Sequence, residues 1–421
     1  MKRPVITPLT AIMLVSLVIL AACNRDNAPQ SRAAGGEIVL RYSGWDIVQL
    51  PVYEELFRQF EAQNPGIRVV TEHTSWGEYW TKLETSIIGR NAPDIFWLNI
   101  PRATAYITNN VLLPLTGLNV NFASFPAPHL GAYTRSGVLY GMPKDFDTMG
   151  LFYNKKLFDD AGVPYPNNSW TWRELKETSE RLTRLLPADT YGIAAPMVWQ
   201  GGYYETIFQA GGWVFSDDGL QSGFEDPRTI EGVEFWYSLM RDGGSMPLDV
   251  LANTPARDVF SAGRVAMLIT GSYQAAPFFQ QSEHRNNLDV AMVPAGPAGR
   301  ASTSNALAHV ISANSRYPAE AKKLIEFLSS RQAHEHVAAS GAVIPSYLGS
   351  QAAWVSAYPG KNAQVFIDMV EFAVPLPNAP NASAATGIEN DIFARAWLGE
   401  ITIREACRLV AARANEILKG Q

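Results

Sequence analysis

Few residues in this sequence combine the types and the spacing that chemistry requires. Asp145 and Asp147 lie two positions apart in the segment PKDFDTMG, and in an extended chain both carboxylates would project from the same face. Such a pair could act in glycoside hydrolysis. It could equally provide two hydrogen-bond acceptors in a binding cleft. The spacing alone leaves both interpretations open.

Neither a metal site nor a cofactor site is predicted. His334 and His336 are two positions apart, so on a helix they would point about 200° apart, whereas helical metal pairs are spaced by four. The sequence has no Walker loop, no GxGxxG, no GxSxG elbow and no CxxC. We therefore expect no catalytic residues, no metal and no cofactor.

Aromatic residues beside turns are the more abundant signal. The chain has 11 Trp, 16 Tyr and 19 Phe, and several of them flank Gly, Ser or Asp. Flat rings suit the apolar face of a sugar, while Asp, Asn and Glu suit its hydroxyls. The same rings could also belong to the core, so the pattern indicates a pocket without locating it.

The first residues predict export. An apolar run from Leu9 follows a positively charged start and is too short to span a bilayer comfortably. It ends in Leu-Ala-Ala-Cys at residues 20–23, the layout of a secretory signal. The four residues resemble a bacterial lipobox, which implies that Cys23 carries lipid. We expect a lipoprotein signal peptide at 1–22 and a flexible tether at 23–37.

The elements that must position the candidate residues alternate between strand and helix. Two amphipathic helical patterns separate three strand patterns, at 38–42, 67–73 and 93–99. This alternation predicts right-handed βαβ units and a parallel sheet. Ligands bind outside the carboxyl ends of such strands, so the loops of interest begin near Ser43, Thr74 and Asn99.

The second half of the chain predicts long helices with clear starts. Thr171 and Thr402 each precede a Glu by three positions, as in a capping box, and Asp226-Pro227 is a third start signal. Strands are predicted at 265–270 and 288–293. A chain of 421 residues with 47% hydrophobic and 18% charged residues is globular and long enough for two domains. The net charge of −6 and the lack of a basic patch argue against nucleic acid.

Taken in order, several segments resemble the extracellular solute-binding proteins of ABC sugar importers, the group that includes maltose-binding protein. The segments are YGMPKDFDTMGLFYNKKLFDDAGVPYPNNSWTWRELKE (140–177), FSAGRVAMLITGSY (260–273), AMVPAGPAGRAS (291–302) and AKKLIEFLSS with the later SGAVIP (321–345). The likeness covers essentially all of 38–419. It implies an α/β, two-lobe periplasmic-binding-protein fold, each lobe a mostly parallel sheet flanked by helices, with three interlobe crossovers.

The resemblance also implies lobe boundaries and binding residues. Lobe one would be 38–146 plus 303–344, and lobe two 147–302 plus 345–421, with the crossovers near 144–150, 303–308 and 341–347. Asp147 matches an acidic residue that bonds sugar hydroxyls, and Tyr273 stands where many members have a stacking tryptophan. The residues expected to contact ligand are Trp45, Asp46, Trp76, Asn99, Asp145, Asp147, Trp199, Tyr203, Tyr273 and Asn305.

The implied function is capture of a carbohydrate and its delivery to an ABC permease. The protein would be a monomer, held by its lipid on the outer side of the cytoplasmic membrane in the bacterial cell envelope. Glycerol phosphate or its diesters are the rival ligands, because Lys144 and Arg102 are available, although the acids nearby argue against them. An exported glycosidase and a sensor subunit are further alternatives. Cys407 is predicted to be a buried, inert thiol.

Overall fold

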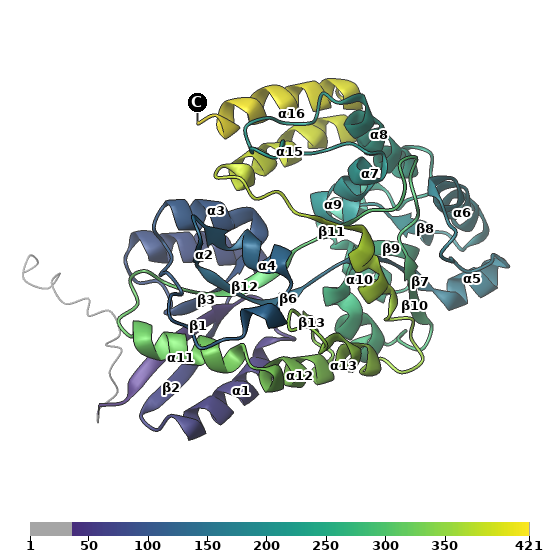
Figure 1. Cartoon of the computed structure of the whole chain (residues 1–421). Helices are drawn as coiled ribbons and strands as arrows, with labels where there is room; N and C mark the ends of the chain where they lie inside the picture. Colours follow the sequence, from purple (N-terminus) through teal and green to yellow (C-terminus); the bar gives the residue numbers. More distant parts are fainter. Residues whose placement is uncertain (1–35, 421) are drawn as a thin grey trace, which may run out of the picture.

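The computed structural model describes residues 36–420, so Cys23, the predicted signal peptide and most of the predicted tether lie outside the described residues. The chain forms two α/β lobes side by side (Figure 1). The two-lobe α/β prediction is confirmed. No helix within the described residues is both long and apolar enough to cross a membrane.

Lobe one is built on a six-stranded sheet with the order β13-β6-β12-β3-β1-β2. Its strands are β1 (Ile38–Gly44), β2 (Ile67–His73), β3 (Ile95–Asn99), β6 (Gly141–Phe146), β12 (Ala306–Ile311) and β13 (Ile344–Pro345). Its helices are α1 (Leu50–Gln63), α2 (Trp76–Ile88), α3 (Ile100–Thr108), α4 (Ala127–Ala132), α11 (Pro318–Leu328) and α12 (Arg331–Ser340).

Lobe two is built on a four-stranded sheet with the order β10-β7-β9-β8. Its strands are β7 (Met149–Asn154), β8 (Tyr191–Ala194), β9 (Val265–Gly271) and β10 (Leu288–Met292). Its helices are α5 (Lys155–Ala161), α6 (Trp172–Leu185), α7 (Tyr204–Gln209), α8 (Pro227–Arg241), α9 (Leu248–Asn253), α10 (Ala256–Ser261), α14 (Val365–Asp368), α15 (Ala382–Trp397) and α16 (Ile403–Leu418).

Short elements complete the fold. They are the β4 (Thr134–Arg135) and β5 (Val138–Leu139) hairpin, the parallel pair β11 (Ser302–Ser304) and β14 (Ala373–Pro375), and α13 (Gln351–Ser356), which follows α12.

The prediction of mostly parallel sheets is wrong, because both sheets are mixed. β1 pairs in parallel with β2 and β3, as the βαβ pattern requires, but β12 is antiparallel to β3 and to β6. In lobe two β7 is antiparallel to β9 and β10, and only β8 with β9 is parallel. The cause is the crossovers. β6 leads the chain out of lobe one, so β12, which brings it back, runs the opposite way.

Local signals fixed several helix starts. Thr171 and Glu174 form the predicted capping box, and the Asp226 side chain accepts from Arg228 N at the start of α8. Thr402 Oγ1 accepts from Glu405 N at 3.1 Å at the start of α16. Cys407, on α16, is fully buried as predicted.

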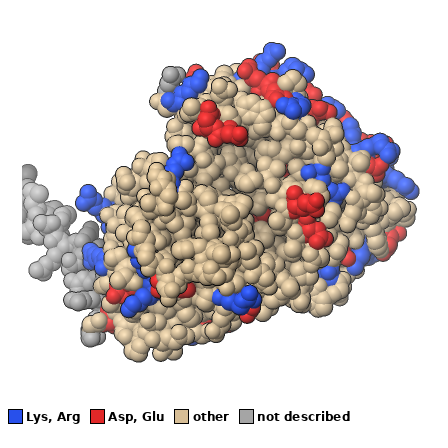
Figure 2. Space-filling view, viewed as in Figure 1, with Lys and Arg blue, Asp and Glu red and all other residues tan. Residues whose placement is uncertain are grey.

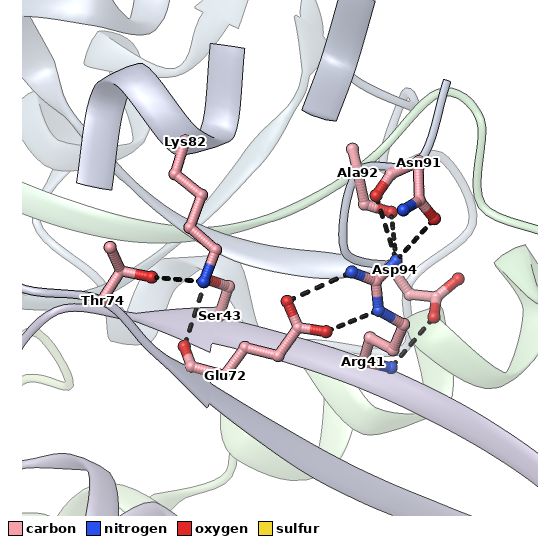
Figure 3. A network of polar contacts seen from close by, with 8 residues as sticks. All are labelled: Arg41, Ser43, Glu72, Thr74, Lys82, Asn91, Ala92 and Asp94. Atoms are coloured by element: carbon pink, nitrogen blue, oxygen red, sulfur yellow. Dashed lines mark hydrogen bonds and ion pairs between the residues drawn. The ribbon is translucent and has the colours of Figure 1, made fainter. Parts of the chain in front are cut away.

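A polar network fastens the outer part of the lobe-one sheet (Figure 3). The Arg41 side chain on β1 pairs with Glu72 on β2 and donates to Asn91 O at 3.0 Å, while Arg41 N donates to Asp94 Oδ2 at 2.9 Å. These contacts join β1, β2 and the loop before β3. The network thereby holds the start of β3 beside the second half of β1, where Tyr42 pairs with Ile95.

Candidate ligand-binding site

Two crossovers lie side by side and bring Asp147 against Asn305. Asp147 N donates to Asn305 O at 2.9 Å, and Asn305 N donates to Asp147 Oδ1 at 3.0 Å. Asp147 lies between β6 and β7, and Asn305 lies between β11 and β12. Asn305 Oδ1 also accepts from Ile100 N at 3.2 Å. These two predicted residues therefore meet where the chain passes between the lobes.

Asp147 receives a further hydrogen bond from lobe two. Gln200 Nε2 donates to Asp147 Oδ1 at 2.9 Å. Burial raises the pKa of the Asp147 carboxyl well above its usual range, although the bonds from Asn305 and Gln200 oppose that shift. Such a carboxyl can accept a hydrogen bond from a ligand hydroxyl when it is ionised, and it can donate one to the hydroxyl when it is protonated.

An aromatic cluster surrounds Trp45 at the carboxyl ends of the lobe-one strands. The ring of Trp45 meets Trp76 edge to face with centroids 5.1 Å apart, and it meets Trp97 in the same way at 5.2 Å. Gly44 makes this packing possible, because a Cβ there would lie 2.8 Å from the Trp97 ring. Trp76 remains 47% exposed. The cluster therefore offers a rigidly backed indole surface to a ligand.

A buried ion pair lies behind this cluster. Lys144 Nζ contacts the carboxylate of Asp145, donates to Gln49 Oε1 at 2.7 Å and lies 4.1 Å from the centre of the Trp97 ring. Neighbouring side chains of a regular strand point to opposite faces. Here the pairing of β6 with β12 shifts register at this point, since Leu307 faces Asp145 and Ala308 faces Pro143. The bulge lets Lys144 and Asp145 meet.

The catalytic interpretation of Asp145 and Asp147 therefore has no support. It assumed a regular extended segment in which both carboxylates share a face. In the structure Asp145 is paired with buried Lys144, whereas Asp147 is bonded to Gln200 and to the backbone of Asn305. The two acids serve different networks.

Asp46 lies just after β1 and Asn99 at the end of β3, and they differ in how their side chains are hydrogen-bonded. Asp46 accepts from Val48 N and from Gln49 Nε2, both at 2.8 Å, so its carboxylate steadies the start of α1. Asn99 is 3% exposed, and its Oδ1 atom has no hydrogen-bond partner among the described residues. A buried acceptor without a partner costs about 1–3 kcal/mol. Asn99 is thus an acceptor that a ligand hydroxyl could satisfy.

Lobe two contributes Trp199 and Tyr273, both half-buried. Trp199 lies in the irregular turn Trp199–Tyr203 that precedes α7, and Tyr273 follows β9. The ring of Tyr273 folds back over Gly271, where a Cβ would lie 2.2 Å from it. Burial and the nearby charge of Asp147 raise the pKa of Tyr273 to about 12. Ser272 N donates to Thr148 O at 3.0 Å, which places Tyr273 beside the first crossover.

Tyr203, one of the residues predicted to contact ligand, points into the core of lobe two. Its side chain is fully buried, and its hydroxyl donates to Glu389 Oε2 at 2.8 Å. Tyr204 donates to the other oxygen of Glu389 at 2.9 Å. Both tyrosines therefore fix α15 against α7 inside lobe two. The turn that carries Trp199 directs the next large side chain into the core.

The sequence did not reveal several residues of the site. Gln200 and Gln49 bond to predicted acids, and Glu205 accepts from the backbone of the second crossover. Only Glu205 left a trace in the sequence, as an acid within the largely apolar segment YYETIFQ. Elsewhere, the two histidines of α12 face different partners, since His334 packs on Phe125 and His336 lies 3.1 Å from Glu55. Within residues 36–420 no three His, Cys, Asp or Glu side chains gather to hold a metal ion.

Two crossovers that join two α/β lobes, with aromatic and polar side chains beside them, define a hinged binding protein. A family model described as bacterial extracellular solute-binding protein matches residues 45–335. The chain belongs to this family. The family is one of binding proteins, which agrees with the prediction that the chain is not an enzyme.

Known relatives share nearly the full length of the chain. A putative binding protein of Brucella abortus (strain 2308) is 28% identical over 97% of this chain and 98% of the relative. The maltodextrin-binding protein MdxE of Bacillus subtilis (strain 168) is 26% identical over 89% of this chain and 88% of the relative. Among solved structures, an ABC substrate-binding protein of Listeria monocytogenes in complex with cycloalternan has a TM-score of 0.84 at 24% identity, covering 90% of this chain and 99% of that one. This likeness shows the same fold.

Proposed function

We propose that this protein is the lipid-anchored substrate-binding protein of an ABC importer, which captures a carbohydrate between its lobes and delivers it to a membrane permease. The observation that carries the proposal is the half-exposed indole of Trp76 against Trp45, at the edge of the lobe-one sheet where Asp147 and Asn305 meet and Leu307 pairs with Asn99. An apolar ring surface combined with hydroxyl-bonding groups suits a sugar.

The relatives support the sugar class. One is named a maltodextrin-binding protein, and others are named a multiple sugar-binding protein of Streptococcus mutans and an arabinooligosaccharide-binding protein of Bacillus subtilis. Their names differ in the length and type of the sugar. We therefore propose the carbohydrate class for this chain and not a particular sugar.

The cationic side chains argue against a sugar phosphate or a glycerol phosphate diester. Such ligands need a free Arg or Lys in the cleft. Lys144 is fully buried and paired with Asp145, and Arg102 is paired with Glu84 at 2.5 Å while its guanidinium covers the Trp80 ring at 4.3 Å. On the face shown in Figure 2, acidic and basic side chains are interspersed, and few lie where the lobes meet.

The mechanism we propose is closure of the two lobes about the crossovers. A ligand that contacts both lobes stabilises the closed form by its differential affinity for that form. Trp45 and Trp76 would hold the ligand from lobe one, and Trp199 and Tyr273 from lobe two. The closed pair of lobes then presents a joint surface to the permease. A lipid on Cys23 would keep the protein near the permease and raise its effective concentration there.

Titration calorimetry and tryptophan fluorescence against mono-, di- and oligosaccharides and glycerol phosphates would test the ligand class. We expect saturable binding of one sugar class with no release of reducing sugar. Trp76→Ala should lose about 1–3 kcal/mol of binding free energy. Tyr165→Ala is the matched control, because Tyr165 is also a partly exposed ring but packs on Tyr153 and Phe158 in lobe two. Binding of phosphates with silence toward sugars would overturn the proposal.

The anchor and the assembly state need separate measurements. Labelled fatty acid should enter the wild-type protein in bacterial cells and should not enter Cys23→Ser. Light scattering of the purified protein should give the mass of one chain. A Cys23→Ser variant that still carries lipid would refute the anchor without affecting the ligand assignment.

A further inference from the structure

A fully buried carboxylate on α7 connects the Trp199 turn to the second crossover. Glu205 Oε2 accepts from Thr303 N at 2.8 Å, and Glu205 Oε1 accepts from Gly201 N at 3.1 Å and from the Thr303 hydroxyl. Glu205 has no exposed surface. Its partners lie about a hundred residues apart in the sequence, so one side chain holds two distant segments at a fixed separation.

Gln200, which precedes Gly201 in the turn, completes a ring of hydrogen bonds. Gln200 donates to Asp147 on the first crossover, and Asp147 accepts from Asn305 N on the second. The Trp199 turn is therefore linked to both crossovers. Gln200 bonds the first crossover directly, and Gly201 is linked to the second through the side chain of Glu205. Tyr273 is the other aromatic residue of lobe two that is proposed to contact ligand. Among the described residues, the short helix that carries it, Ser272–Gln274, has no hydrogen bond to the second crossover.

The backbone of the turn requires such a partner. Gly201 has φ +71 and lies where a Cβ would be 3.3 Å from Ile269 O, so the turn is seated tightly on β9 in a left-handed conformation. Its N–H has no helical or strand partner, and an orphaned buried N–H is costly. Glu205 satisfies it. The conformation of the turn and the position of Thr303 thus depend on the same carboxylate.

We propose that Glu205 is a positioning residue that couples the Trp199 turn to the second crossover, so that a contact made at the turn is transmitted to the hinge. This inference deepens the proposed function and rests on it for the identity of the contact, a carbohydrate. Glu205 touches no ligand itself. Its role is to make the turn and the base of the hinge move as one unit.

Glu205→Gln is a sharp perturbation, because backbone N–H groups can only donate. In either orientation the amide nitrogen of the new side chain faces Thr303 N–H or Gly201 N–H, and one bond is lost. Glu389→Gln is the matched control. Glu389 is also fully buried in lobe two, but its partners are the hydroxyls of Tyr203 and Tyr204, which can rotate to accept from an amide.

Hydrogen exchange of the ligand-free protein tests the coupling without any sugar. We expect Glu205→Gln to speed exchange about tenfold in peptides covering 199–203 and 301–305, equivalent to about 1.4 kcal/mol of lost protection. Glu389→Gln, which touches the turn through Tyr203 but makes no bond to the second crossover, should leave the 301–305 peptide unchanged. Trp199→Ala should speed exchange at 301–305 in the wild-type background and have no added effect with Glu205→Gln. Additive effects of the two substitutions would overturn the proposal.

A second arm uses the sugar that binds most tightly in the panel. Small-angle scattering should show the wild type and Glu389→Gln contracting on saturation, whereas Glu205→Gln binds more weakly and contracts less. If Glu205→Gln does not fold, Thr303→Val compared with Thr303→Ser replaces it, since only Val removes the hydroxyl bond. Full contraction in Glu205→Gln would refute the coupling. Absence of any sugar response in the wild type would refute the proposed function, and the exchange experiment would still decide the role of Glu205.

Discussion

Replacing Lys144 by Met tests whether the buried ion pair behind the Trp45 cluster exists in solution. Lys144 is the partner of Asp145, the donor to Gln49 and the cation beside the Trp97 ring. The side chains of the pair are 0% and 4% exposed. Lys144→Met leaves the carboxylate of Asp145 buried without its partner, and breaking a buried pair in this way costs about 3–5 kcal/mol.

A double substitution separates the pair from the packing. Lys144→Met with Asp145→Leu removes both charges, and replacing a buried pair by apolar residues of similar volume is often close to neutral. We expect the double variant to be more stable than Lys144→Met alone by at least about 2 kcal/mol. Urea unfolding followed by tryptophan fluorescence is the assay, because Nζ lies 4.1 Å from the Trp97 ring centre. A Lys144→Met cost below about 1 kcal/mol, with additive effects, would refute the buried pair.

Three other predictions follow from the same contacts. Tyr203→Phe should lower the free energy of unfolding by about 1 kcal/mol and leave the sugar affinity unchanged. Tyr273→Ala should instead lose about 1–3 kcal/mol of binding free energy, measured by calorimetry. The reverse pattern would place Tyr203 in the site. Burial raises the pKa of Glu389 from 4.5 to about 8, so the folded state holds this proton more tightly than the unfolded state and stability falls as pH rises. Glu389 should account for about 3 kcal/mol of the decrease in unfolding free energy between pH 5 and 8. Glu389→Gln should remove that part of the pH dependence, and an unchanged slope would contradict the assignment. Burial raises the pKa of the Cys407 thiol to about 12, so a thiol reagent should label Cys407 only in denaturant; rapid labelling of the native protein would show an open α16.

The parts of the fold that were predictable are those written in short stretches of sequence. Thr171 with Glu174 and Asp226 with Pro227 fixed helix starts, because a cap is decided by residues within one turn. The βαβ pattern likewise placed Trp45 and Trp76 at neighbouring strand ends, and the structure brings their rings together. These features depend on local chemistry and on the handedness of the crossover connection.

The parts that were not predictable depend on partners far along the chain. The contact of Lys144 with Asp145 requires a bulge that pairing with β12 creates, more than a hundred residues later. Tyr203 turned inward because Glu389, 186 residues away, accepts its hydroxyl. The direction of β12 followed from its return across the hinge and not from any signal in its own residues. Sequence periodicity carries no information of this kind.

The central position of β12 has a consequence for how the chain folds. β12 lies between β3 and β6, and it pairs Leu307 with Asn99. A chain made from its amino terminus cannot join β3 to β6 until β12 has emerged, at about residue 311, and cannot complete the lobe-one sheet until β13 at 344–345, whereas the four strands of the lobe-two sheet all lie within residues 149–292. Lobe two can therefore acquire its sheet first. Loop closure over so long a separation is slow, so the segments of lobe one that precede β7 would wait for their partner strands after lobe two has formed its sheet.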